Sequence, residues 1–130
     1  MIINQKTTLM NPTMETSMVL YLVIVLFVFA TMIGVLMISM QLQGEIVSKN
    51  IMYAHIILAI VAIVVLAVFS YQYPDNYPKL SLILFGLAGL LGIYMFSNFL
   101  KEKRNPFIID LVYGLLAMGG FVYLIFFVFY

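Results

Sequence analysis

The chain alternates between long apolar stretches and short polar connections. Four apolar stretches of 21 to 24 residues cover positions 17–40, 51–71, 80–100 and 107–130. About 20 residues are needed to cross the hydrocarbon core of a bilayer as a helix. The pattern therefore predicts four transmembrane helices, joined by connections of about ten, eight and six residues. None of these connections is long enough for a folded domain outside the membrane.

Turn-forming residues fall between the apolar stretches. Asn11-Pro12 and Asn105-Pro106 are typical helix starts, with Asn as the capping residue and Pro at the first helical position. Gly44 suits a stop after the first helix, and Ser48 or Asn50 suits the restart of the second. The segment 73–78, with two prolines, cannot continue a helix. We predict an all-α membrane protein, with residues 1–130 forming one domain, a compact up-down bundle of four helices.

Composition supports a lipid environment. The chain is 65% apolar and 8% charged, whereas soluble domains carry about 25% charged residues. The net charge of +1 gives no indication of a nucleic-acid partner. The absence of cysteine excludes disulfides, thiolate metal sites and cysteine nucleophiles. The partners that we expect are the lipid bilayer and other membrane-protein subunits, with a homo-oligomer as an alternative.

The distribution of cations predicts an orientation. The connections after the first and third helices share one side of the membrane and contain Lys49, Lys101, Lys103 and Arg104. The opposite side has only Lys6 and Lys79. Because cytoplasmic loops carry the excess of Lys and Arg, both termini are predicted to be extracytoplasmic.

An internal repeat is one interpretation of the sequence. Residues 34–42 resemble residues 92–100, with Gly, Met, Ser and Leu matching at an offset of 58. The helices that follow align from Asn50 and Asn105 at an offset of 55, which makes His55 and Asp110 equivalent. Two duplicated helical hairpins would produce this pattern. Chance similarity within an apolar alphabet is the other interpretation.

Small residues are expected to mark the faces on which the helices pack, because lipid already solvates large apolar side chains. Such residues recur along one stripe of each helix, since positions i, i+4 and i+7 share a face. The predicted packing residues are Ala30, Gly34, Ala59, Ala62, Gly86, Gly89, Gly92, Gly114 and Ala117.

His55 and Asp110 are the candidates for a polar site within the membrane. His55 is the only histidine, and Asp110 is the only acidic residue within a predicted span. Ionisable residues within a span are candidate functional residues. The two could form a pair that relays protons or links two helices. In the simpler interpretation, each lies near the interface, and Asp110 pairs with a basic residue of the loops.

Haem b and copper are the two candidate cofactors. His55 could be an axial ligand of haem b, although one histidine per chain would require a second ligand from elsewhere. Met10, Met14 and Met18 recur every four residues on one helix face. Their thioethers are the soft ligands that Cu(I) prefers, but methionine also fills irregular packing contacts.

Three functions follow from these residues. The first is a non-catalytic accessory subunit of a larger membrane complex, such as an energy-converting oxidoreductase. The second is a membrane redox protein with haem or copper. The third is a small transporter or channel with a His55–Asp110 polar site. The sequence contains no nucleotide-binding loop, metalloprotease helix or nucleophile elbow, so we expect no catalytic activity of its own.

Overall fold

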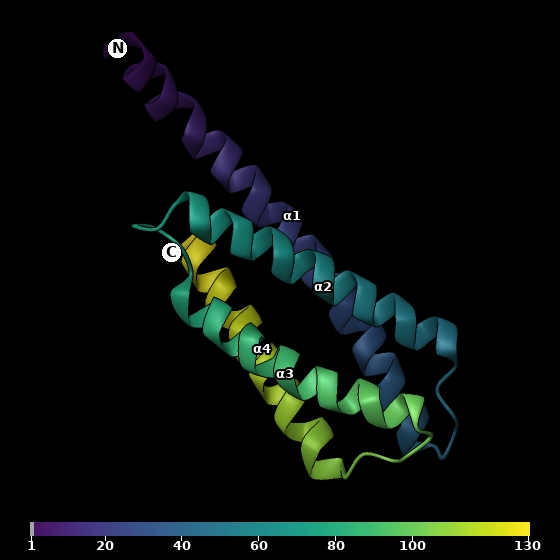
Figure 1. Cartoon of the computed structure of the whole chain (residues 1–130). Coiled ribbons are helices and arrows are strands. Elements are labelled where there is room, and N and C mark those ends of the chain that lie inside the picture. The colour runs from purple at the N-terminus through teal and green to yellow at the C-terminus, as the bar shows by residue number, and fades with distance from the viewer. Residues whose placement is uncertain (1) are drawn as a thin grey trace. The chain divides into compact units, whose positions relative to one another are not determined.

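The computed structural model describes the backbone of residues 2–130 and the side chains of residues 17–130. The described chain consists of four α-helices, labelled in Figure 1. Their bounds are α1, Ile2–Leu42; α2, Lys49–Gln72; α3, Lys79–Leu100; and α4, Phe107–Phe129. This confirms the predicted all-helical fold.

Each of the four helices is long and apolar enough to cross a membrane. The candidate spans are Ser17–Leu42, Lys49–Gln72, Lys79–Leu100 and Phe107–Phe129. They coincide with the predicted stretches to within two residues at each end. Four such helices make the chain compatible with a small multi-pass membrane protein.

Two predicted N-caps, at Asn11 and Asn105, are wrong. The helix α1 begins at Ile2 and continues through Asn11 and Pro12, although a proline inside a helix removes one backbone hydrogen bond and crowds the preceding turn. At α4 the N-cap residue is Pro106 and not Asn105. The Asn105 side chain instead accepts a hydrogen bond at Oδ1 from Asn98 Nδ2, at 2.8 Å.

The chain divides after Gln72 into two compact units, each a helical hairpin. In the first hairpin α1 packs along α2 (Figure 1). The buried residues recur every three or four positions, which places them on one face of each helix. They are Leu20, Val23, Phe27 and Ala30 on α1, and Ala62, Leu66, Phe69 and Ser70 on α2.

In the second hairpin α3 packs along α4, and its core is built on a contact between an aromatic ring and a glycine. A Cβ atom on Gly120 would lie 3.0 Å from Cε1 and 3.1 Å from Cδ1 of Phe85. The Phe85 ring therefore lies against the backbone of α4. Ser81 and Ala88 are buried on the same face of α3, and Leu124 is fully buried on α4.

The two hairpins turn in the same way. After α1 the amide of Glu45 donates to Met40 O and the amide of Gly44 donates to Gln41 O. These are the two hydrogen bonds of the Schellman motif, which needs a residue with positive φ. Gly44 has φ 77° and fills that position.

After α3 the same two bonds join Lys103 N to Asn98 O and Glu102 N to Phe99 O. Here the residue with positive φ is Glu102, at 57°. Left-handed backbone is unfavourable for a residue with a Cβ atom, so this loop stores strain that the first loop avoids.

The next helix begins with a cap in only one of the hairpins. Ser48 Oγ accepts a hydrogen bond from the amide of Ile51 at 3.3 Å, which caps α2. Pro106 occupies the corresponding position before α4 and provides no side-chain cap. The predicted restart at Ser48 is therefore confirmed.

Candidate functional site

His55 lies in the α1–α2 contact of the first hairpin. Its Nδ1 is 2.9 Å from the carbonyl oxygen of Ala30. A Cβ atom on Gly34 would be 3.2 Å from His55 Cε1. Gly34 therefore leaves the space that the imidazole ring occupies, and the ring reaches the carbonyl one turn earlier on α1. Ala30 and Gly34 were predicted as packing residues because they are small. In the structure they form the part of α1 that His55 contacts.

The hydrogen bond defines the chemistry available at His55. A carbonyl oxygen only accepts hydrogen bonds, so Nδ1 carries the proton that it donates to Ala30 O. In a neutral ring Nε2 is then the acceptor, and Nε2 is the only ring atom that could ligate a metal. Backbone hydrogen bonding through Nδ1 is typical of metal-ligating histidines, and it also satisfies a histidine whose role is packing.

Asp110 belongs to the second hairpin and lies in the first turn of α4. Its Oδ1 atom is buried and accepts no hydrogen bond from any residue that the structure describes. An unsatisfied polar group costs about 1–3 kcal/mol, and more when it is charged. The positive end of the α4 dipole offsets part of that cost. The predicted pairing with a basic loop residue is not seen for this oxygen.

The second hairpin has a contact that corresponds to the one between His55 and Gly34. A Cβ atom on Gly92 would be 3.4 Å from Cε2 of Tyr113. Gly92 and Tyr113 each follow their counterparts by 58 positions. Tyr113 thus has the same place against Gly92 that His55 has against Gly34, whereas the alignment from Asn50 and Asn105 makes His55 equivalent to Asp110. The duplication itself stays a prediction. An aromatic ring against a glycine is a shared feature of both hairpins.

The His55–Asp110 pair stays a prediction. The two residues belong to different hairpins, and each is described within its own. What the structure establishes is the local environment of each: His55 has a backbone partner in α1, whereas Oδ1 of Asp110 lacks a donor in its hairpin.

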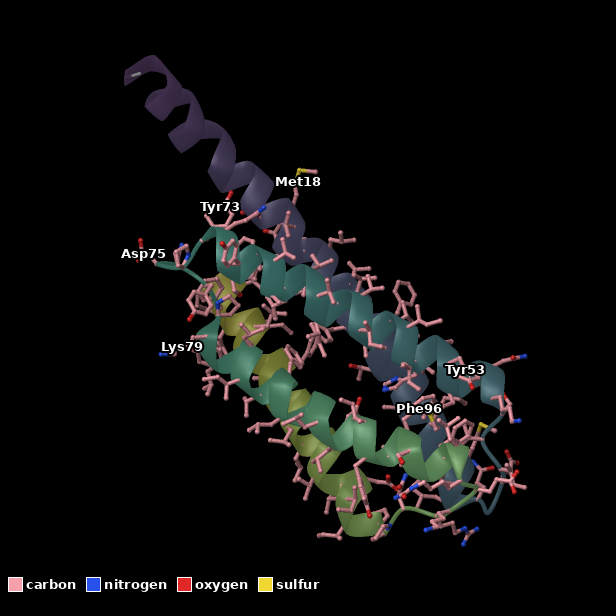
Figure 2. All side chains as sticks on the ribbon, viewed as in Figure 1. Met18, Tyr53, Tyr73, Asp75, Lys79 and Phe96 are labelled. Atoms are coloured by element: carbon pink, nitrogen blue, oxygen red, sulfur yellow. The ribbon has the colours of Figure 1, made fainter. Side chains whose placement is uncertain are left out.

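The methionine face is described at one of its three positions. Met18 is 67% exposed and projects away from α1 (Figure 2). Met10 and Met14 lie outside the residues whose side chains are described. Across the described residues, no group of three or more His, Cys, Asp or Glu is placed to hold a metal ion. Copper at these methionines therefore stays a prediction.

The predicted packing residues differ in their surroundings. Ala30 and Ala62 are buried, and Gly34 and Gly92 lie against rings. Ala59 and Ala117 are half-buried. The remaining three have open space, because no described atom outside their neighbouring residues and their own helix backbone lies within 4 Å of a Cβ added to them; these are Gly86, Gly89 and Gly114. Their role in packing stays a prediction.

Sequence reasoning missed Ser81. This residue is fully buried, and its hydroxyl has no hydrogen-bond partner among the described side chains and backbone. The buried hydroxyl of Ser70, by contrast, donates to the carbonyl of Leu66 at 2.8 Å. The sequence gives no sign of this difference, because serine in a helix usually forms the bond that Ser70 forms.

Comparison with known proteins assigns no family to this chain. Neither a family model, nor a curated protein, nor a solved structure matches this chain.

Proposed function

We propose that this chain is a non-catalytic subunit of a larger membrane complex, such as an energy-converting oxidoreductase, in which its helices pack against those of partner subunits. The observation that carries the proposal is the buried Oδ1 of Asp110, which has no donor within its hairpin. Polar groups in lipid are satisfied within protein, and hydrogen bonds between helices hold membrane assemblies together. A donor from a neighbouring helix would complete this site.

The surroundings of Asp110 support a neighbouring helix. Gly114 lies one turn further along α4, on the stripe that Asp110 shares, and the space beside it is open. A glycine beside open space lets another helix approach closely. Rotation of the Asp110 carboxylate about its last bond exchanges its two oxygens, so either oxygen can meet the incoming donor.

The proposal also covers the arrangement of the chain. We propose that the two hairpins are duplicated units that pack as one compact four-helix domain, with both termini extracytoplasmic. Support for duplication comes from the turn hydrogen bonds and the ring–glycine contacts, which recur 58 positions apart. Support for the orientation comes from the four cations in the connections after α1 and α3.

Native purification tests the proposal. The tagged chain is extracted from its own membranes in mild detergent and analysed by native electrophoresis and mass spectrometry. We expect a large assembly with stoichiometric partner subunits. Gly114→Leu should release the chain from that assembly, because the added side chain fills the space beside Asp110. Ala67→Leu, at an exposed position of α2, is the matched control and should leave the assembly intact.

Two outcomes would contradict the proposal. The first is a wild-type chain that migrates only as a monomer or small homo-oligomer. The second is a Gly114→Leu chain that remains fully assembled.

A small transporter is the second candidate, because a protonated His55, with Nδ1 bonded to Ala30 O, could donate from Nε2 to Asp110. Proteoliposomes containing the purified chain should then conduct protons or cations, and Asp110→Asn should abolish that flux. The accessory-subunit proposal expects no flux from either protein.

A further inference from the structure

The connection between α3 and α4 holds three cations on a backbone that is already internally bonded. The amides of Lys101, Glu102 and Lys103 donate to carbonyl oxygens of the last turn of α3. The side chains of Asn98 and Asn105 are hydrogen-bonded across the base of the loop, at 2.8 Å. The residues 101–105, here called the basic loop, therefore have a defined path, and the backbone amides of residues 101–103 are already hydrogen-bonded within the protein.

The cationic side chains of the basic loop point into solvent. Lys101, Lys103 and Arg104 are all exposed, and they form no ion pair with any residue in the described part of the chain. Glu102 is the one acidic residue of the loop, so its net charge is +2.

The corresponding loop of the first hairpin shows that folding does not require these cations. Its three turn hydrogen bonds, from the amides of Gln43, Gly44 and Glu45, match those of the basic loop at an offset of 58. Its residues nevertheless carry a net charge of −1 over positions 43–46, with Ile46 where the basic loop has Arg104. The same backbone motif thus forms without a single cation, so the charge of the basic loop is free to serve binding.

The position of the basic loop indicates what it binds. It joins two helices that are long enough to span a membrane, one ending at Leu100 and the other beginning at Phe107. Residues directly after a span lie at the level of the lipid headgroups, where anionic phospholipids attract lysine and arginine. Arginine can bind a phosphate through two parallel hydrogen bonds, and lysine acts as a point charge.

We propose that the basic loop binds the phosphate of an anionic phospholipid headgroup, with Arg104 as the principal contact and Lys101 and Lys103 as flanking charges. Each cation near an anionic surface contributes about a fivefold gain in binding. The three together should favour an anionic lipid over a zwitterionic one by about a hundredfold.

The test measures lipid bound to the purified full-length chain. The detergent-solubilised protein is titrated with phosphatidylglycerol or phosphatidylcholine, and bound lipid is counted by native mass spectrometry. We expect preferential retention of phosphatidylglycerol, reduced by about a hundredfold in Lys101→Gln/Lys103→Gln/Arg104→Gln. The control Lys49→Gln/Lys79→Gln removes two cations elsewhere and should retain most of the binding.

A second variant and two further measurements complete the test. If the triple variant does not fold, Arg104→Gln and the wild type at raised salt serve instead, and both should bind less phosphatidylglycerol. The proposal is overturned if the two lipids bind equally, or if the triple variant binds like the wild type. It is also overturned if millimolar inorganic phosphate displaces the lipid, because the loop would then recognise free phosphate.

Discussion

Single side chains at the helix contacts determine how closely each hairpin packs. Phe85 against Gly120 shows this most clearly, because three ring atoms lie 3.0 to 3.2 Å from the position of a Cβ on that glycine. Gly114, on the same helix, has nothing within 4 Å. The surroundings of Gly114 and Gly120 therefore predict opposite effects of the same substitution.

Gly120→Ala should lower the free energy of unfolding of the detergent-solubilised chain by about 1–3 kcal/mol, the usual cost of overpacking a core. Gly114→Ala should leave stability unchanged or raise it slightly, because alanine favours the helix and meets open space. Unfolding in increasing SDS, followed by circular dichroism, measures both. Equal destabilisation by the two substitutions would contradict the contacts described for α4.

The buried hydroxyl of Ser81 has no described hydrogen-bond partner, so its removal is predicted to stabilise the second hairpin. Ser81→Ala removes a buried polar atom that has no described partner, so it should stabilise the hairpin by up to about 1 kcal/mol. Ser70→Ala is the control, because that hydroxyl bonds to the carbonyl of Leu66, and it should be neutral or mildly destabilising. A loss of stability in Ser81→Ala would show that its hydroxyl has a partner.

At the scale of helices and turns, the hairpins share one construction. Their turn hydrogen bonds and ring–glycine contacts recur at a constant offset of 58. They differ in the residue that takes the positive φ, which is Gly44 in one loop and Glu102 in the other. Substitutions at Gly44 and Glu102 therefore test how much the residue with positive φ contributes to the stability of each loop.

Glu102→Gly should raise the free energy of unfolding by up to about 1 kcal/mol, because glycine adopts left-handed backbone without a steric penalty. The reciprocal Gly44→Ala should lower it by about 1–2 kcal/mol. SDS titration of the two variants beside the wild type gives both values. Effects of the reverse sign would mean that the turns do not have the geometry described.

The sequence predicted the helices well, since runs of apolar residues and turn formers depend only on local composition. It predicted the caps unevenly. Ser48 caps α2 as expected, but the side chain of Asn105 bonds to that of Asn98. Asn98, seven positions away, thus takes the side-chain oxygen with which Asn105 would cap α4. Rules for helix caps consider only the residues next to the helix start, so they do not predict this bond.

The candidate site was predicted only in part, because side-chain contacts between helices depend on register. Ala30 and Gly34 stood out by size, but nothing in their spacing shows that His55 would fill the space beside them. The alignment from Asn50 and Asn105 has an offset of 55, whereas the ring–glycine contacts recur at an offset of 58. The alignment makes His55 equivalent to Asp110, whereas the residue that lies against glycine in the second hairpin, as His55 does in the first, is Tyr113.

For the whole molecule, the central claim is that four helices cross the membrane as two hairpins. The claim implies that the turns after α1 and α3 share one side and that the turn after α2 lies on the other. That middle turn carries Tyr73 and Asp75 (Figure 2). The natural absence of cysteine allows single cysteines to be introduced as unique labels.

The most direct measurement is the accessibility of single cysteines at Gln43, Asp75 and Lys101 to a membrane-impermeant thiol reagent, in intact cells and in inverted vesicles. The account predicts that Asp75→Cys is labelled from one side, and that Gln43→Cys and Lys101→Cys are labelled only from the other. With both termini outside, Asp75→Cys is the variant labelled in intact cells. Labelling of all three from the same side would contradict the four-span account.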